Sequence, residues 1–442
     1  MASIGGGNST STSTYDSSKN YSVPLALLIG LFFMIGFITV MNDVLIPSLK
    51  GVFNITENWK LMMIQFCFFG AYGIMSIPAG SIIAKIGYKK GLTLALSIMG
   101  TGLFMFVPAA SLLSFELFLA ALFIVACGLT ILQVAINPYI ISLGRPETGA
   151  ARLNLGGALN STATFIGPII GGALILKPGL IDAVAKADAV KGPYIVLALV
   201  TIAIGVLLYF ITLPKLEVEE EVQTNDSYGK FKHLIFGSGA IFFYVGAEVA
   251  IGSLLILYLH KDFGVDEKMA SSLVAYYWGS AMIGRFIGSA LGQTIKANVM
   301  LAAVSIGAIA LIVLSMVGFT TPIDIPVMIM NTDPSFSINF INQPIPMAAF
   351  FLVLVGLLNS VMWPCIFPLG IAKLGSFTSK GSGLMCSMIV GGAFIPLLQG
   401  VIADSIGYKL SFIVCVICYL YLLFFAVKGH KTDYLDSEEK GE

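Results

Sequence analysis

Charge is what this sequence has least of. Of its 442 residues only 11% are Asp, Glu, Lys or Arg, whereas 57% are hydrophobic, and the mean hydropathy is +0.92. A water-soluble domain carries about a quarter charged residues, so most of this chain's surface cannot face water. The formal net charge is zero, which gives no basic footprint for a nucleic-acid partner. These scarcities exclude a soluble globular protein and predict a membrane protein.

Residue types for metal binding and nucleophilic chemistry are also scarce. The six cysteines all lie in apolar runs, and the three histidines all fall at the expected ends of helices. Cys415 and Cys418 form a C-x-x-C pattern inside an apolar helix without metal-type companions, so we interpret the cysteines as packing thiols. The sequence therefore predicts neither an enzyme nor a resident cofactor.

Long apolar runs are abundant. They are about 20 residues long, which fits helices that cross a bilayer, and they lack the alternating polarity of membrane β-barrel strands. The expected spans are residues 24–48, 61–84, 92–110, 116–142, 152–176, 193–213, 233–259, 268–292, 298–318, 346–370, 380–402 and 409–428. The sequence thus predicts an all-α polytopic membrane protein with 12 transmembrane helices.

A charged segment divides these spans into two sets of six. We expect a disordered tail at 1–23, a six-helix bundle at 24–213, a linker at 214–232, a second six-helix bundle at 233–428 and a tail at 429–442. An even number of spans puts both termini on one side. The loops on that side hold twice as many Lys and Arg residues as the opposite loops, which predicts cytoplasmic termini in a bacterial inner membrane.

The two halves also contain an internal echo. The segment GSIIAKIGYK, from Gly80 to Lys89, reappears as GVIADSIGYK from Gly400 to Lys409, at a constant offset of 320 residues. The first copy follows a span that runs inward and the second follows a span that runs outward. Inverted repeats of this kind are typical of transporters, whose binding sites lie near the bilayer midplane between the repeats.

Two carboxylates fall well inside expected spans, and each half supplies one, Asp43 and Glu248. A charge in mid-bilayer costs about 2.5–3.5 kcal/mol on insertion scales, so each carboxylate is a functional candidate. The alternative is a protonated acid that hydrogen-bonds between helices.

Amides and aromatic rings lie in the same layers, often four residues apart and therefore on one helix face. The pairs are Gln133 with Asn137, Tyr244 with Glu248, and Asn359 with Trp363, and Asn160 lies one turn before Thr164. Such a set suits a polyol, whose hydroxyls need donors and acceptors and whose C–H face stacks on rings. The alternative is that the amides only join helices, at about 0.6 kcal/mol a pair.

Further along the chain, Arg285 lies toward the inner end of its span. It either closes an inner gate or extends its charged head to the interface.

Several of these segments resemble those of one transporter superfamily. Gly80 to Lys90 resembles the loop motif between helices two and three of the major facilitator superfamily, with Ala84 where that motif usually has Asp. Lys85 and Lys89 are then gating candidates. Four more specific segments are QVAINPY (133–139), RLNL with Asn160 (152–160), YVGAEVAIGS (244–253) and WPCIFPLGIAKLG (363–375). Together they resemble the fucose permease and glucose/galactose transporter family of sugar symporters.

That resemblance implies two pseudo-symmetric six-helix bundles that rock around a central site. It implies a monosaccharide substrate such as glucose or galactose, coupled to a cation gradient. Asn42 and Asp43 fall where the family keeps a carboxylate for the coupling ion, which is either a proton or Na⁺ bound at Asp43. Gln133 stands where the fucose permease pattern has Glu, which favours the glucose/galactose branch. The expected partners are the sugar and the lipid bilayer, and we expect a monomer.

Two other transport functions stay open at this point. The pattern Gly167-Pro168-x-x-Gly171-Gly172 resembles the end of a motif found in drug:proton antiporters of the same superfamily, although the fourth helix lacks the Arg of those antiporters. An uncoupled facilitator is the other alternative, and uptake with collapsed ion gradients would reveal it.

The substitution Gln133→Glu tests whether this face of the fourth helix lines a sugar cavity. A Gln offers one acceptor and two donors, whereas an ionised Glu only accepts. An unmatched buried group costs about 1–3 kcal/mol, so uptake of the native hexose should weaken by one to two decades and the ranking of sugars should change. Competition uptake with hexoses and fucose, normalised to protein level, measures this ranking. An unaltered ranking in a stable variant would contradict the cavity placement.

Overall fold

The computed structural model describes residues 21–143, 149–177, 182–211, 228–291, 294–317, 319, 321–331, 336–374 and 377–432. Within them the chain is helical apart from turns and one β-hairpin. Most of the expected tails and most of the expected linker lie outside the described residues, but α1 already begins at Ser22, inside the expected N-terminal tail.

The N-terminal half contains six spans. They are α1 (Ser22–Phe53), α2 (Asn58–Ile86), α3 (Tyr88–Phe104) with α4 (Phe106–Ser111), α5 (Phe115–Ser142), α6 (Gly149–Ile175) and α7 (Ala183–Phe210). Each of these spans overlaps one of the six runs expected from hydropathy, and α6 and α7 end at Ile175 and Phe210, before the expected ends at 176 and 213. The sixth was expected to begin at residue 193 and begins ten residues earlier. Its first turns are polar, and they are supported by the Asp182 side chain, which accepts from Ala185 N, and by an ion pair between Asp188 and Lys191.

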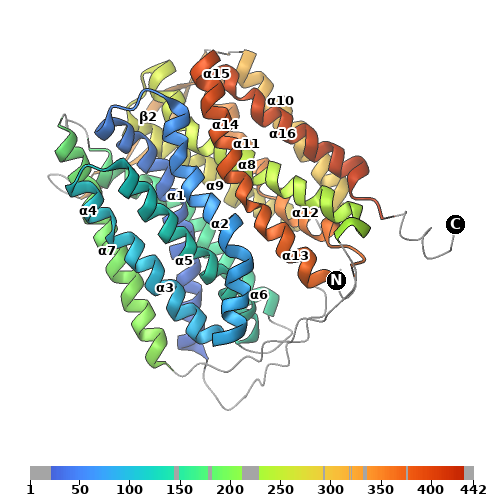
Figure 1. Cartoon of the computed structure of the whole chain (residues 1–442). Helices are drawn as coiled ribbons and strands as arrows, with labels where there is room; N and C mark the ends of the chain where they lie inside the picture. The colour runs from blue at the N-terminus through green and yellow to red at the C-terminus, as the bar shows by residue number, and fades with distance from the viewer. Residues whose placement is uncertain are drawn as a thin grey trace.

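The C-terminal half contains the other six spans. They are α8 (Lys232–Phe263) after the short η2 (Tyr228–Lys230), α9 (Glu267–Leu291), α10 (Ala297–Val317), α11 (Met347–Asn359) with α12 (Met362–Gly370), α13 (Thr378–Ser387) with η4 (Met388–Val390) and α14 (Gly391–Ile406), and α15 (Tyr408–Ser411) with α16 (Ile413–Phe424) and η5 (Phe425–Gly429). Figure 1 shows this yellow-to-red half beside the blue-to-green N-terminal half. The predicted two-by-six helical architecture is confirmed.

Not every span is apolar enough to be recognised alone. Among the described helices, ten have the length and hydropathy to cross a membrane, or eleven if α11 and α12, bent by 40°, count as one span. The twelfth is α9, which is 25 residues long and packs against α6, α8 and α11. Because helices cover part of its surface, α9 can carry the polar side chains Ser271, Trp278 and Arg285.

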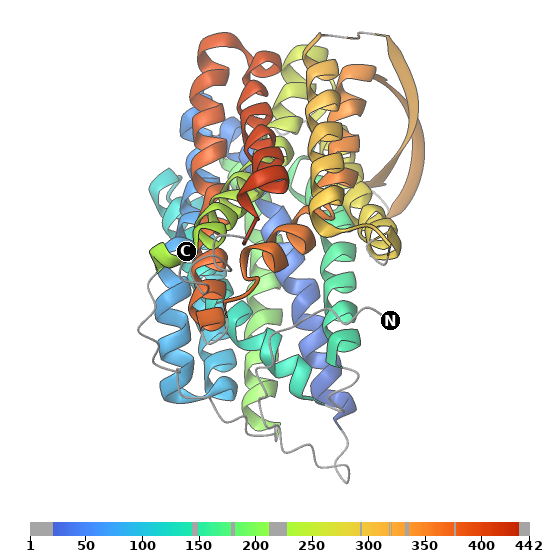
Figure 2. The same ribbon diagram turned by 90° about the vertical axis from the view of Figure 1, so that its right-hand side faces the viewer.

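The β-hairpin between α10 and α11 was not expected from the sequence. Strands β1 (Pro322–Asn331) and β2 (Ser337–Pro346) pair antiparallel, from Pro322 opposite Pro346 to Asn331 opposite Ser337. The hairpin lies along the flank of its own half (Figure 2). Helix α9 holds it there, because the Tyr276 hydroxyl donates to Pro326 O (2.6 Å) and Lys268 Nζ donates to Asn331 Oδ1 (2.8 Å).

The most extensive contacts between the halves are those of α2 with α14 and of α6 with α9. We call the end of the molecule that carries the hairpin and the α1–α2 and α14–α15 turns the hairpin side, and the opposite end, with the α2–α3 turn, the linker side. On the hairpin side, Asp404 accepts from Asn58 N (2.8 Å) and Trp59 N (3.1 Å), and Ser271 Oγ donates to Pro168 O (2.6 Å). The halves are therefore closed against each other on the hairpin side.

The internal echo has the same backbone conformation in both copies. Gly87 ends α2 with φ 82° and ψ 159°, and Gly407 ends α14 with φ 83° and ψ 163°. Positive φ favours glycine, so both copies need this residue. The next helix begins at Tyr88 in one copy and Tyr408 in the other. Gly87 lies on the linker side and Gly407 on the hairpin side, as an inverted repeat requires.

Candidate functional site

Asp43 lies in the middle of a hydrogen-bonded set contributed by both halves. Its Oδ1 accepts from Gln65 Nε2 (3.1 Å) on α2 and from Ser253 Oγ (3.0 Å) on α8. Its Oδ2 accepts from Trp278 Nε1 (3.1 Å) on α9, and Gln65 Nε2 also donates to Ser253 Oγ (2.7 Å). We call these four residues the Asp43 network. Asp43 is 3% exposed, so its carboxylate depends on protein donors rather than on water.

The chemistry of the Asp43 network suits an ionised carboxylate. An indole N–H can only donate, and the amide nitrogen that faces Asp43 is a donor as well. Protonation of Asp43 would add a fourth hydrogen to a carboxylate at which three donor hydrogens already point, so it would weaken these hydrogen bonds. Because Ser253 and Trp278 belong to the C-terminal half and Asp43 to the N-terminal half, the charge on Asp43 is linked to contact between the halves.

Two polar atoms beside this network have no hydrogen-bond partner. They are Nδ2 of Asn42, which precedes Asp43, and Oε1 of Gln65. Both side chains are 1% exposed. Three of the groups close to Asp43 present hydrogens, whereas a Na⁺ ion requires several oxygens around it. In this conformation the neighbours of the Asp43 carboxylate thus face it with hydrogens rather than with oxygens. Elsewhere in the described part of the chain no three His, Cys, Asp or Glu side chains gather as a metal site.

A second polar cluster lies between α6, α8 and α9, closer to the linker side. The Tyr244 hydroxyl is hydrogen-bonded to the Glu248 carboxylate, and the Arg285 guanidinium is near enough to attract that carboxylate. Arg285 Nη1 also donates to Ser161 Oγ (2.6 Å) on α6, across the interface between the halves. The predicted pair of Tyr244 and Glu248 is thus brought together with the predicted gating residue Arg285.

The predicted pair on α5, Gln133 and Asn137, consists of one bonded side chain and one exposed side chain. Gln133 is half-buried and its Nε2 donates to the Tyr72 hydroxyl (3.0 Å) on α2, so it is anchored within the N-terminal half. Asn137, one turn nearer the linker side, is exposed. Exposed polar side chains at Asn137 and Arg285 place accessible polar surface on the linker side of Asp43.

Asn359 is the predicted site residue that is most enclosed. It is 0% exposed, its Nδ2 donates to the Tyr277 hydroxyl (2.9 Å), and its Oδ1 accepts from the Tyr419 hydroxyl (2.6 Å). Tyr277 in turn donates to the Glu248 carbonyl (2.9 Å). In this conformation the Asn359 amide joins three helices of one half, α9, α11 and α16, and supports the backbone of Glu248.

The remaining predicted residues lie farther apart. Asn160 Nδ2 donates to Phe32 O (3.1 Å) and holds α6 against α1. Trp363 is half-buried and stacks on Phe367. The predicted gating residues Lys85, which is exposed, and Lys89, which is half-buried, lie at the linker-side ends of α2 and α3.

Several residues of these clusters were not predicted from the sequence. They are Gln65, Tyr72, Ser161, Ser253, Tyr277, Trp278 and Tyr419. Gln65 carried a usable signal, because it is an amide inside an apolar span, 22 residues after Asp43. Ser253 ends the segment 244–253 quoted for the family resemblance but was not singled out, and Ser161 and the aromatics carried no signal, since such residues are common in membrane helices.

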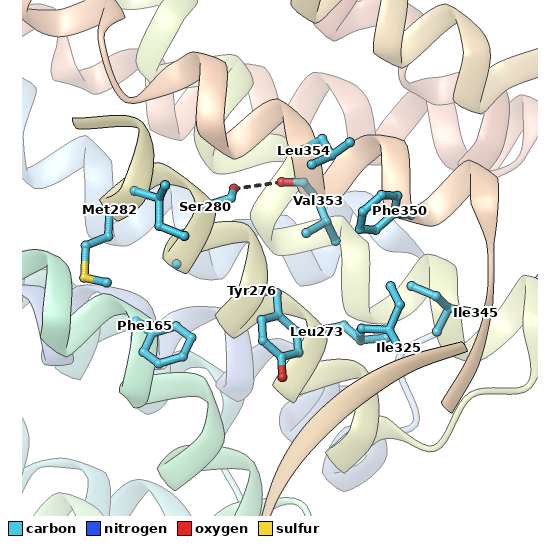
Figure 3. Close-up of a pocket in the computed structure, with 12 residues that line it drawn as sticks. Phe165, Leu273, Tyr276, Ser280, Met282, Ile325, Ile345, Phe350, Val353 and Leu354 are labelled. Atoms are coloured by element: carbon cyan, nitrogen blue, oxygen red, sulfur yellow. Dashed lines mark hydrogen bonds between the residues drawn. The ribbon is translucent and has the colours of Figure 1, made fainter. Parts of the chain in front are cut away.

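The pocket drawn in Figure 3 is separate from these polar clusters. It has a volume of about 320 Å³ and lies between α6, α9, α11 and the hairpin. Its two side chains with polar groups are already bonded, since Tyr276 donates to Pro326 O and Ser280 Oγ to Val353 O (2.9 Å). The rest of its lining is apolar, with Phe165, Ile325 and Phe350 among it. A pocket without free donors or acceptors does not suit a sugar.

Comparison with known proteins gives one consistent result. The family model described as Major Facilitator Superfamily matches residues 27–385. The glucose/galactose transporter of Brucella abortus (strain 2308) is 42% identical over 422 residues, which cover 94% of this chain and 96% of that protein. The L-fucose-proton symporter of Escherichia coli (strain K12) is 28% identical over 435 residues, with 92% and 93% covered.

Solved structures agree with the sequence comparison. The crystal structure of FucP, a Major Facilitator Superfamily transporter in the outward conformation, aligns with a TM-score of 0.66 at 27% identity. The alignment covers 94% of this chain and 100% of that one.

Replacing the enclosed amide by Asn359→Ala should destabilise the C-terminal half. The Tyr419 hydroxyl would lose its acceptor in a buried place, which costs about 1–3 kcal/mol of the free energy of unfolding. Thermal unfolding of the purified protein in detergent measures this, with Asn137→Ala as a matched control because Asn137 is exposed. Equal midpoints for the two variants would show that Asn359 does not support the fold.

Proposed function

The chain belongs to the major facilitator superfamily, and from this premise we propose that it imports a hexose, glucose or galactose, in symport with protons by alternating access. The observation that carries the proposal is the Asp43 network, in which a buried carboxylate of one half is held by donors of the other. The relatives are named as a glucose/galactose transporter and an L-fucose-proton symporter, which supports both the substrate class and the coupling.

The structure is closed on the hairpin side, and its exposed polar residues lie toward the linker side. If the termini are cytoplasmic, as the distribution of Lys and Arg predicts, the linker side faces the cytoplasm of a bacterial cell. The sugar would then leave past Asn137 and Arg285. Opening the other side requires α2 to separate from α14, and α6 from α9.

We assign the sugar to the space between α5, α6 and α8. Gln133 and Tyr72 offer an amide and a hydroxyl on the N-terminal half, and Glu248 with Tyr244 offers a carboxylate and a ring on the C-terminal half. A pyranose needs donors, acceptors and an apolar face, and this set supplies all three. Arg285, bonded to Ser161, would have to move when the halves rock.

Coupling follows from the contacts of Asp43. When the hairpin side opens, Ser253 and Trp278 move away with the C-terminal half, and an ionised Asp43 loses two of its three donors. A buried carboxylate without partners is strongly disfavoured, whereas a protonated one is not. Proton uptake at Asp43 therefore favours the state open to the hairpin side, and proton release favours the state seen here. The donor set that disfavours Na⁺ leads us to propose the proton as the coupling ion.

The same geometry argues against the drug:proton antiporter. Both Glu248 and Asp43 are surrounded by hydrogen-bonding groups rather than by an open apolar cavity, and lipophilic cations need the latter. An uncoupled facilitator would have no use for a carboxylate shared between the halves.

The substitution Asp43→Asn should abolish concentrative uptake but leave exchange of sugar between sugar-loaded vesicles. Asn is close in shape but cannot take up and release a proton. Radiolabelled hexose uptake into proteoliposomes, with a pH gradient and a Na⁺ gradient imposed separately, measures both activities. Ser253→Ala is the matched control, because it removes one donor and keeps the carboxylate, so it should still accumulate sugar. Gradient-driven accumulation by Asp43→Asn, or accumulation driven by Na⁺ alone in the unmodified protein, would contradict the proposal.

The substitution Glu248→Gln should lower the apparent affinity for the hexose by about tenfold or more. A hydrogen bond to a charged group contributes about 1.5–3 kcal/mol, and the neutral amide also leaves Arg285 without its counter-charge. Equilibrium binding of the sugar to the purified protein gives this value directly. Glu116→Gln, at an exposed carboxylate on α5, serves as control, and equal affinities for the two variants would return Glu248 to a structural role.

A further inference from the structure

The N-terminus of α2 is capped by the other half of the molecule. The residue before the helix, Glu57, makes no side-chain cap of its own. Instead the Asp404 carboxylate, near the end of α14, accepts from the first backbone N–H groups, Asn58 N at 2.8 Å and Trp59 N at 3.1 Å. A negative charge at a helix N-terminus interacts favourably with unpaired N–H groups and with the helix dipole.

Neighbouring contacts hold the two helices together at this point. The Tyr408 hydroxyl donates to Asn58 Oδ1. Gly400 lets the backbones approach closely, since a Cβ placed there would lie 2.9 Å from Trp59 Cα. Lys50, on α1, interacts electrostatically with Asp404. The cap is therefore built into the seam between α2 and α14 on the hairpin side.

The inverted repeat supplies the counterpart of this seam on the opposite side. The offset of 320 residues that relates Gly87 to Gly407 also relates the first residue of α2, Asn58, to the first residue of α13, Thr378. It relates Asp404 to Ala84. The residue that would cap the first turn of α13 from the end of α2 is thus an alanine, which has no acceptor.

We propose that Asp404 is a one-sided latch: it holds the hairpin side closed, and Ala84 leaves the linker side without an equivalent, so the empty protein favours the conformation seen here. The inverted repeat relates the contact between the start of α2 and the end of α14 to the contact between the start of α13 and the end of α2. The first has a carboxylate, Asp404, and the second has Ala84 at the equivalent position. When the hairpin side opens, the α2 N–H groups exchange Asp404 for water. When the linker side closes, position 84 offers the α13 N-terminus no carboxylate, because it is an alanine. The latch acts through helix position, so Asp404 is a positioning residue rather than a sugar or ion ligand.

The inference rests on alternating access, which is part of the proposed function, but on neither the sugar nor the ion. A conformational measurement without substrate or gradient therefore tests it separately. Spin labels carried by unnatural amino acids leave the native cysteines in place. One pair, at Val184 and Leu410, reports on the hairpin side, and a second pair, at Tyr209 and Ile235, reports on the linker side. All four side chains are at least 47% exposed.

Asp404→Ala should lengthen the hairpin-side distances and shorten the linker-side distances, with the hairpin-side-open population rising roughly tenfold, as loss of a charged hydrogen bond implies. Ala84→Asp should shift the populations in the same direction by adding a cap on the other side, and the double variant should shift them furthest. Ser405→Ala, at an exposed neighbour bonded only within its own helix, should change neither distance.

Unchanged distance distributions in a folded Asp404→Ala protein would overturn the latch. If Asp404→Ala does not fold, Ala84→Asp decides alone, because it leaves the hairpin-side contacts intact, and an unshifted population in that variant refutes the proposed asymmetry. If the populations are unchanged, the proposal is refuted even where the variant still shows normal coupled uptake. Conversely, failure of hexose uptake in the unmodified protein would leave these distances, and hence the latch, unaffected.

Discussion

The rest of this structure depends on one constraint. The buried Asp43 carboxylate has its full set of hydrogen-bond donors only while the two halves of the molecule are in contact. Asp43 takes donors from α2, α8 and α9, and two of these helices belong to the other half. All its donors are neutral, so no fixed positive charge holds the carboxylate ionised. In the proposed mechanism its charge state is therefore coupled to the closure of the hairpin side, as a symporter requires.

The seams between the halves are built for close but reversible contact. Gly172 meets Ser271, Gly279 meets the ring of Phe165, and Gly400 meets the backbone of α2. In a bilayer, lipid competes with protein for apolar surface, so such contacts rely on fit and on hydrogen bonds rather than on hydrophobic burial. A few polar groups, Asp404 among them, can then decide which side of the molecule is closed. The hairpin is bonded to the C-terminal half through α9, and β1 also packs against α6 of the N-terminal half.

Candidate residues could be found from the sequence more easily than their roles. Gln133 and Asn137 share a helix face, as predicted from their spacing, but one is bonded to Tyr72 and the other is exposed. Asn359 was placed with the sugar ligands, whereas the structure encloses it between Tyr277 and Tyr419. Spacing along one helix shows which side chains point together. It does not show which side chains of other helices lie opposite, and those partners decide whether an amide is free for a ligand.

The sequence by itself determined the helices, their grouping into two sets of six, and the two carboxylates worth attention. It could do so because lipid forces each spanning segment to satisfy its own backbone, so that length and hydropathy identify most spans, and because a charge in such a segment is costly. Tertiary structure alone decided the partners of Asp43, the docking of the hairpin on Tyr276 and the trans cap from Asp404. The residues joined in this way are from 22 to 346 positions apart, and only packing of whole helices brings such residues within hydrogen-bonding distance.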